Sequence, residues 1–354
     1  MIESAASLPV AMRTACAALA GVVVLLALTT GVAAADPRKL IHTSKAMGTS
    51  VQITIWSDDE QTAAEAAKAV FAEMDRLDRM MTTWIPESEV SQINTGAGTT
   101  AVKVSDETFT VITRAVEISK LSKGLFDITV GAYGGLWKFD EDMDGTLPDP
   151  KDVAARKKLV SWKDIVLDKR KHTVKLRRKG MKITLGGIAK GYAVDKAAAV
   201  LVDAGVSDFI LQVGGDMYVS GTKGATPWVV GIRDPRGPRD QSFAVAPVKD
   251  HAFSTSGDYE RAFVKDGVRY HHILDPRTAQ PARATRSVTI LAKDAFTADA
   301  WSKVLFIMGA KDAMPLVEKL PDFEAVFVDA DNNVHVSSGL RDKLKVLSPP
   351  TAGI

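Results

Sequence analysis

Strand hairpins and single amphipathic helices are mixed along this chain, and the mixture excludes a regularly alternating strand–helix fold. Alternating β-branched residues predict a half-buried strand at residues 51–55. Residues 174–178 and 181–185 predict a hairpin around Lys179-Gly180, and residues 325–328 and 334–336 predict another. We therefore expect an α+β fold, with mixed or antiparallel sheets and packed helices.

Apolar residues at spacings of three and four predict the helices. One helix carries the stripe Val70, Met74, Leu77 and Met81. A capping box formed by Ser57 and Glu60 predicts its start. A second helix is expected from Ser105 to Gly124, a third after Gly191 that is closed by Gly205, and a fourth at residues 297–308. Single strands are predicted at residues 209–213, 228–232 and 287–291. Core packing explains these stripes better than a cofactor-binding helix face does.

Charge and cysteine content exclude several classes of function. The chain has 45 Lys and Arg against 43 Asp and Glu, a net charge of +2, and the two signs are interspersed. Proteins that bind nucleic-acid phosphates need a basic surface, so we expect no nucleic-acid partner. The single cysteine, Cys16, excludes a disulfide framework, a cysteine-rich zinc module and a thiolate iron–sulfur site.

The first 35 residues read as a targeting segment. Arg13 precedes an apolar run at residues 14–28, and Ala33-Ala34-Ala35 supplies small residues for cleavage. We expect residues 1–35 to be a signal peptide and the protein to be periplasmic. The alternative is an uncleaved membrane anchor, because residues 14–35 approach the roughly 20 needed to span a bilayer. Residues 36–354 contain no cysteine and are expected to form one domain, possibly two intimate subdomains.

Residues 184–191 are the first candidate for chemistry. Gly186, Gly187 and Gly191 allow a backbone to turn closely around a ligand, and the start of the following helix favours an anion. Lys190 adds a positive charge at the same end. The segment is either a phosphate cradle or a tight turn with a solvated lysine. It matches neither a P-loop nor the Gly-x-Gly-x-x-Gly dinucleotide motif.

Two later segments carry further candidates. In an extended segment His271 and His272 point to opposite faces, so they cannot serve one metal. One of them is a candidate base or a structural histidine, and the block Asp275-Pro276-Arg277-Thr278 has turn chemistry. Asp299 stands in the first turns of a helix, as a solvated carboxylate or a magnesium ligand.

Further strings accompany these segments in order along the chain. The full set is Met47-Gly48-Thr49, Met81-Thr82-Thr83-Trp84, residues 124–131, residues 185–195, Gly214-Gly215-Asp216, residues 255–259, residues 272–278 and Ala298-Asp299-Ala300. Taken together and in this order, they resemble the ApbE-type FAD:protein FMN transferases, and the resemblance spans residues 40–309.

The resemblance implies an activity, cofactors and a partner. Members of this family are exported and have a T-fold-like flavin transferase architecture. They bind FAD, use Mg²⁺, and transfer FMN through a phosphoester to a Ser or Thr hydroxyl of an acceptor protein, releasing AMP. The acceptor carries a Ser/Thr-Gly-Ala-Ser/Thr motif, and family membership points to a membrane electron-transfer subunit.

The resemblance also implies roles for individual residues. The FAD site would be lined by Met47, Trp84, Leu125, Phe126, Asp127, Thr184, Lys190 and Leu274. The Gly187 carbonyl and the Asp299 carboxylate would bind the metal. His272 is the candidate base, and Asp275 would orient it or act in its place.

One departure from the family pattern concerns the metal. The family commonly has Thr four residues after the aspartate, where this chain has Lys303. An ammonium group has no lone pair to offer Mg²⁺. Either Lys303 turns away and Ser302 or water completes the metal shell, or Lys303 takes part of the metal's place. The second case favours the alternative functions, a non-catalytic FAD-binding protein or an FAD pyrophosphatase. A solute-binding or structural protein without flavin is a third possibility.

Milder departures are Thr184, where many members have Asp, and Ala279, where Gly is common.

Overall fold

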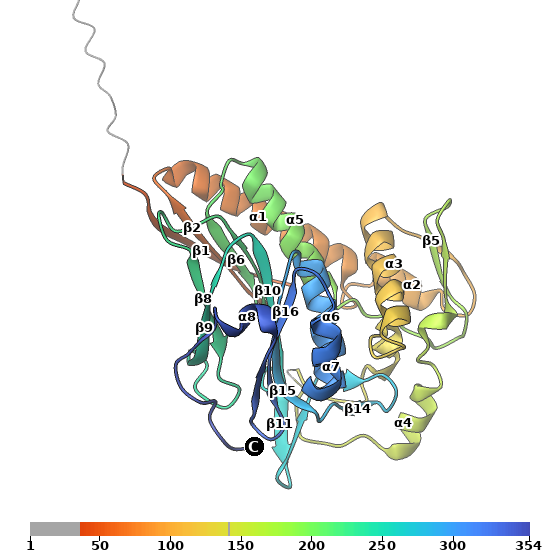
Figure 1. Ribbon diagram of the computed structural model, residues 1–354. Helices are drawn as coiled ribbons and strands as arrows, with labels where there is room; N and C mark the ends of the chain where they lie inside the picture. Colours follow the sequence, from red (N-terminus) through yellow and green to blue (C-terminus); the bar gives the residue numbers. More distant parts are fainter. Residues whose placement is uncertain (1–35, 141) are drawn as a thin grey trace, which may run out of the picture. The chain divides into compact units, whose positions relative to one another are not determined.

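The computed structural model describes residues 36–140 and 142–354 (Figure 1). The predicted signal peptide, residues 1–35, lies outside the described residues. The described residues belong to one compact unit. None of the helices within them is both long enough and apolar enough to span a membrane.

An antiparallel sheet of eight strands runs through this unit. Its order is β1-β2-β6-β7-β10-β15-β16-β17, and every neighbouring pair is antiparallel. The strands are β1 (Arg38–Ala46), β2 (Thr49–Ser57), β6 (Phe209–Val213), β7 (Asp216–Ser220), β10 (His251–Gly257), β15 (Thr285–Ala292), β16 (Phe323–Asp329) and β17 (Val334–Val336).

Both faces of this sheet are covered. Helices α1 (Glu60–Met81), α5 (Ala189–Asp203) and α6 (Ala295–Met308) pack on one face, and β8 (Trp228–Arg233) and β9 (Ser242–Val248) lie on the other (Figure 1). The alternation of side chains in β16 shows this directly, because Ala325 and Phe327 join the core under the helices, whereas Val326 and Val328 join the core under β8 and β9. The helical layer carries the candidate site.

Smaller elements complete the unit. The helices are α2 (Glu89–Thr95), α3 (Asp106–Leu121), α4 (Pro150–Lys157), α7 (Ala310–Val317), α8 (Ser338–Arg341) and the 3₁₀ turns η1 (Ile128–Tyr133) and η2 (Trp162–Asp164). The strands are β3 (Val102–Lys103), β4 (Ile165–Asp168), β5 (Thr173–Leu176), β11 (Ala262–Lys265), β12 (Val268–His271), β13 (Leu274–Asp275), β14 (Gln280–Pro281) and β18 (Lys345–Val346).

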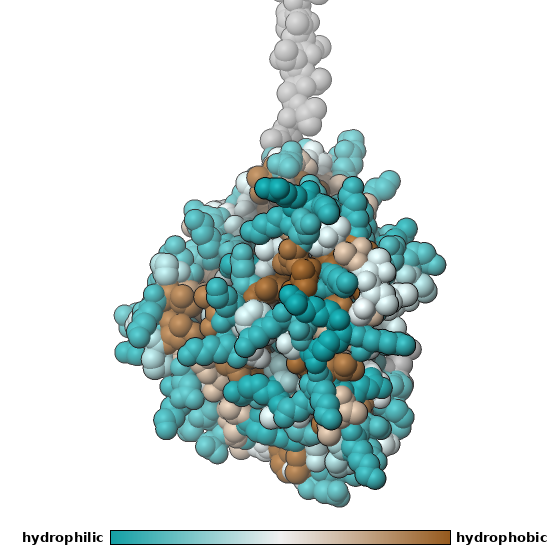
Figure 2. Space-filling model, turned by 90° about the vertical axis from the view of Figure 1, so that its right-hand side faces the viewer, coloured by the Kyte–Doolittle hydropathy of each residue, from teal (hydrophilic) through white to brown (hydrophobic). Residues whose placement is uncertain are grey.

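Figure 2 shows the side that carries α2, α3 and α4. Hydrophilic side chains dominate this side, and the apolar ones form separate small patches.

The α+β prediction is confirmed, as are the predicted strands inside β2, β6, β8 and β15 and the hairpin of β16 and β17. The predicted start of α3 is also confirmed, because the Ser105 hydroxyl accepts a hydrogen bond from the Thr108 amide.

Two local predictions are wrong. The N-cap of α1 is Asp59, whose carboxylate accepts from the Thr62 amide, rather than Ser57. The hairpin predicted around Lys179-Gly180 does not form, because β5 pairs with β4 and residues 181–185 are not a strand. Asp168 closes the actual turn by accepting from two backbone amides, and His172 adopts a positive φ there.

Candidate active site

The contact between α5 and α6 brings two of the predicted segments together. The Gly191 amide, in the first turn of α5, donates to Asp299 Oδ2 at 2.8 Å. First-turn amides have no acceptor within their own helix, so α6 supplies one. A Cβ on Gly191 would lie 2.2 Å from the Ala295 carbonyl oxygen and 2.6 Å from Asp299 Cβ. Only glycine therefore permits this approach, which places Asp299 beside the glycine-rich turn.

Lys190 is held by a buried carboxylate. Its ammonium lies 2.5 Å from Oδ2 of Asp216, which is 1% exposed, and the Ser254 hydroxyl donates to the other carboxylate oxygen. Burial alone would raise the pKa of Asp216, but the ammonium groups of Lys190 and Lys303 hold it below its usual value. Burial opposes the charge of Lys190, yet Asp216 and Asp299 raise its pKa above the usual value. Lys190 is therefore a fixed cation at the start of α5.

Lys303 forms an ion pair with Asp299, the carboxylate predicted to bind the metal. Asp299 is fully buried, and Lys303, one helical turn later, forms an ion pair with its Oδ1 atom. The Gly191 amide occupies Oδ2, so both carboxylate oxygens have partners. The Ser302 hydroxyl donates to the backbone carbonyl of Asp299 at 2.7 Å and lies 2.7 Å from the Ser256 hydroxyl. Of the two arrangements expected for Lys303, the structure shows the one in which it does not turn away.

The two histidines face opposite sides, as predicted. His271 is buried, and its Nε2 lies 2.8 Å from the Ala282 carbonyl oxygen, so it is a structural residue. His272 is exposed. Although the residue is exposed, the protein around its imidazole desolvates the charged form and lowers the pKa of His272 to about 3, and the charges of Arg261, Lys190 and Lys303 act in the same direction. The imidazole is therefore neutral and able to accept a proton. Because the charges of Lys190 and Lys303 act on its pKa, His272 lies within electrostatic range of both lysines.

Arg261 connects this neighbourhood to the first hairpin. Its carbonyl accepts from the His272 amide at 3.1 Å, and its guanidinium pairs with Asp140 at 2.7 Å. A Cβ on Gly48 would lie 3.6 Å from that guanidinium. Met47 and Gly48 both have positive φ, as a two-residue type I′ turn requires. Arg261 thus lies between the turn that contains Met47 and the segment that contains His272, and sequence reasoning missed it.

Residues 125–128 lie against the glycine-rich turn. A Cβ on Gly187 would be 3.3 Å from the Phe126 ring, and the Thr184 amide donates to the Ile128 carbonyl at 2.9 Å. Leu125 is buried beside Phe126.

Asp127 has a structural role in this segment. Its carboxylate accepts from the amide and hydroxyl of Thr129 and from the Trp162 amide at 2.6–2.8 Å. Burial raises its pKa. Its oxygens cap η1 and hold the chain that follows α4.

The Asp275 carboxylate is bonded to Arg277 and not to His272 in the described residues. Its carboxylate accepts from the Arg277 amide at 2.8 Å and pairs with the Arg277 guanidinium at 2.6 Å. Within residues 36–140 and 142–354 no hydrogen bond joins it to His272. The predicted orienting contact is therefore absent from this arrangement, and Asp275 closes the turn after β13. Ala279, where the family commonly has Gly, adopts φ +61° at the end of this turn.

No hydrogen bond joins Trp84 or Leu274 to Lys190 in the described part of the chain. Trp84 lies between α1 and α2 and is 83% exposed. Leu274 is half-buried and packs in the small core that contains Tyr133 and Trp137.

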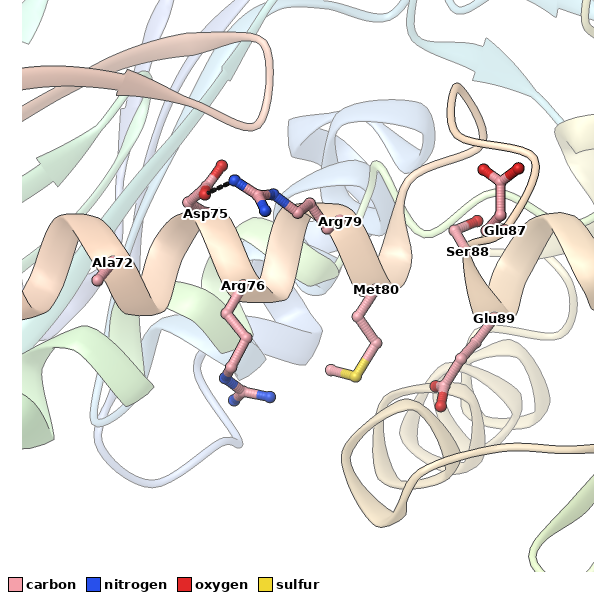
Figure 3. A pocket seen from close by; sticks show the side chains of 8 residues that line it. All are labelled: Ala72, Asp75, Arg76, Arg79, Met80, Glu87, Ser88 and Glu89. Atoms are coloured by element: carbon pink, nitrogen blue, oxygen red, sulfur yellow. Dashed lines mark hydrogen bonds and ion pairs between the residues drawn. The ribbon is translucent and has the colours of Figure 1, made fainter.

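A surface hollow between α1 and α2 contains none of the predicted site residues (Figure 3). Asp75 and Arg79, which line it, pair with each other, and Arg76 pairs with Glu73 and Glu107. These charges are already satisfied, so the hollow is a weaker candidate than the cluster around Lys190.

Comparison with known proteins shows the family of the chain. A sequence profile described as the ApbE family matches residues 47–327. The chain belongs to the ApbE family. An FAD:protein FMN transferase of Treponema pallidum (strain Nichols) is 31% identical over 317 residues, which cover 85% of this chain and 87% of that protein. One of Klebsiella pneumoniae (strain 342) is 30% identical, covering 86% and 94%.

Solved structures of ApbE proteins share the fold. The crystal structure of the ApbE protein from Thermotoga maritima superimposes with a TM-score of 0.79 at 35% identity, covering 86% of this chain and 99% of that one. The flavin transferase ApbE from Vibrio cholerae gives a TM-score of 0.77 at 25% identity, covering 87% and 99%. The predicted flavin transferase architecture is confirmed.

The magnesium site expected for an ApbE protein can be tested against these residues. The Gly187 carbonyl accepts no hydrogen bond within the described residues, as a ligand oxygen would require. Both Asp299 oxygens are occupied, however, and the Ser302 hydroxyl donates into its own helix. No group of three or more His, Cys, Asp or Glu suited to a metal occurs in the part of the chain that the structure describes. As arranged, the residues do not fit a divalent ion.

Asp195 positions the site and was missed by sequence reasoning. From within α5, its carboxylate accepts from the Ala295 and Phe296 amides at 2.8 and 2.9 Å, which caps α6. Asp195→Ala is expected to lower the free energy of unfolding by about 2 kcal/mol, because both amides lose their acceptor. Urea unfolding of the variant and the wild type measures the difference. An unchanged midpoint and slope would contradict the capping role.

Asp195 also predicts a pH dependence. Burial raises its pKa to about 7 in the folded state, above its usual value of 3.8. Between these two pH values the folded protein keeps a proton that the unfolded chain releases, so this residue's contribution to stability is lost as pH rises. Asp195→Asn should remove that part of the decline in a series of unfolding curves. The same slope in both proteins would refute the assignment.

Proposed function

We propose that this chain is an FAD:protein FMN transferase. The relatives it matches over most of their length carry that name. The single observation that carries the proposal is the grouping of a fixed cation, Lys190, with the glycine-rich start of α5 and the neutral imidazole of His272. A dinucleotide's diphosphate needs such a cation and helix start, and a hydroxyl acceptor needs such a base.

The residues present supply positioning, charge and a proton acceptor. Lys190 and the positive end of α5 hold the diphosphate of FAD, the substrate. His272 takes the proton of an acceptor Ser or Thr hydroxyl, whose oxygen attacks the phosphorus on the FMN side. The phosphoanhydride bond breaks, its bridging oxygen leaves with AMP, and FMN remains as a phosphoester on the acceptor. Asp299, Ser302 and Lys303 are not arranged for a divalent ion, so we propose this step without the predicted Mg²⁺.

We also propose the compartment and the partner. The apolar run and the small residues before Asp36 support export to the periplasm. The acceptor is a protein with a Ser/Thr-Gly-Ala-Ser/Thr motif, a membrane electron-transfer subunit. Only the sequence resemblance supports this choice of acceptor.

A transfer assay tests the activity. The purified protein is incubated with FAD and a domain that carries the acceptor motif, and the control domain has Ala at the last motif position. A mass gain of one FMN unit on the intact motif alone, with AMP release, is expected. An unmodified acceptor with intact FAD would instead indicate a non-catalytic FAD-binding protein, and free FMN with AMP would indicate a pyrophosphatase.

The pKa of His272 predicts the pH profile of the reaction. The pH dependence of kcat/KM reports groups of the free enzyme. Because the pKa of His272 is about 3, protonation of this residue should not lower kcat/KM between about pH 8 and about pH 5. A bound diphosphate offsets the charges of Lys190 and Lys303, which raises the pKa of His272 and moves the acid limb of kcat to higher pH. Initial rates at several FAD concentrations and a series of pH values give the acid limb of kcat/KM and the acid limb of kcat separately. An acid limb of kcat/KM at the ordinary histidine pKa would contradict this prediction.

A further inference from the structure

We infer that the ammonium of Lys303 is the resident cation of this site, so that the protein binds the diphosphate of FAD without a divalent metal ion. The inference rests on the proposed function only for the identity of the ligand. In the protein itself, the Lys303 side chain of α6 takes the place that a metal was expected to have beside Asp299.

Each carboxylate oxygen in the ion pair already has a partner. Asp299 is fully buried, and its two carboxylate oxygens receive the Lys303 ammonium and the Gly191 amide. A divalent ion would have to displace Lys303, whose side chain is only 19% exposed, or bind against its positive charge. The Ser302 hydroxyl is also committed, to the Asp299 carbonyl and Ser256.

The charges of the cluster are already balanced. Lys190 and Lys303 face the carboxylates of Asp216 and Asp299, and both ammonium groups hold the pKa of Asp216 below its usual value. Each of the two carboxylates thus has an ammonium beside it, which opposes the binding of a divalent ion. A site that needs Mg²⁺ keeps carboxylate oxygens free for it.

Lys303 can still serve a phosphate. An ammonium has three N–H donors, and only one is needed for Asp299. The side chain is 19% exposed, and we infer that the other donors reach a phosphate oxygen. Lys190, at the start of α5, offers a second ammonium in the same neighbourhood. The diphosphate is thus neutralised by lysines, where a metal would otherwise bridge it.

The decisive measurement uses Mn²⁺ as the metal probe. Binding removes the sharp resonance of free Mn²⁺, which electron paramagnetic resonance detects. The wild-type protein should leave this signal unchanged, both alone and with FAD present. Lys303→Thr should remove it at about one ion per chain, because it frees Asp299 Oδ1 and adds a hydroxyl ligand. Lys311→Thr is the matched control, since it removes the same charge from an exposed position on α7.

FAD binding provides the second readout, through quenching of flavin fluorescence. In the wild type the Kd should change less than about twofold between chelator and Mg²⁺. In Lys303→Thr the Kd should be at least about tenfold larger in chelator, and Mg²⁺ should return it to the wild-type value.

The outcomes separate the two proposals. Stoichiometric Mn²⁺ binding by the wild type, with or without FAD, would overturn the inference while leaving the transferase proposal intact. If the wild type binds neither Mn²⁺ nor FAD, the transferase proposal fails and the displacement of the metal stands. These wild-type measurements decide the question even if Lys303→Thr does not fold.

Discussion

His272→Gln is expected to lower the rate of FMN transfer by about 10² to 10⁴-fold while leaving FAD affinity within about twofold of the wild type. The imidazole is a neutral base within electrostatic range of Lys190 and Lys303, and glutamine keeps the bulk of the side chain without accepting a proton near neutral pH. Single-turnover transfer to the acceptor domain, monitored by intact mass, gives the rate. Flavin fluorescence gives the affinity.

The adjacent histidine is the matched control for this variant. His271 is buried, and its Nε2 atom lies against the Ala282 carbonyl oxygen. His271→Gln should lower stability without lowering the transfer rate of the folded protein. Equal losses of rate in the two variants, or an unchanged rate in His272→Gln, would remove His272 from the mechanism.

Lys190→Met is expected to have the largest effect on both stability and binding. The substitution leaves the Asp216 carboxylate, 1% exposed, without its closest cation. Removing one partner of a buried ion pair lowers the free energy of unfolding by about 3 kcal/mol or more. The low end of that range applies here, because the ammonium of Lys303 still acts on Asp216. FAD affinity should fall at least about tenfold, because the cation at the start of α5 is lost.

A second substitution separates these two effects. Lys190→Met combined with Asp216→Asn removes the uncompensated charge, so the free energy of unfolding should return toward the wild-type value. FAD affinity should stay low, because no cation has been restored. Recovery of FAD binding in the double variant would show that Lys190 acts only through stability. Denaturant unfolding and fluorescence titration on the three proteins provide the comparison.

The parts of the fold predicted from sequence are those fixed by local patterns. The alternation at residues 51–55 and the cap at Ser105 depend on neighbours within a few residues, and both are confirmed. The hairpin at residues 174–185 was wrong because two turn candidates flank β5. Asp168, with two backbone amides bonded to its carboxylate, closes the turn that forms, whereas Lys179-Gly180 does not.

The site was predictable where one segment carries the chemistry, and less so where partners are far apart. Lys190, His272 and Asp299 stand out in their own segments, and the structure brings them into one neighbourhood. Asp216 and Asp195 were missed because each acts on a residue 26 or 100 positions away. The string Gly214-Gly215-Asp216 was the available indication for the first of them. The position of Lys303 was left open because helical spacing allows it to face Asp299 or solvent.

Crystals of the protein soaked with FAD provide the most direct measurement of where the dinucleotide binds. We expect electron density for its diphosphate between the first turn of α5 and His272, within hydrogen-bond distance of the Lys190 ammonium. Density for the diphosphate at the hollow between α1 and α2, or at any place out of reach of Lys190 and His272, would contradict the proposed active site.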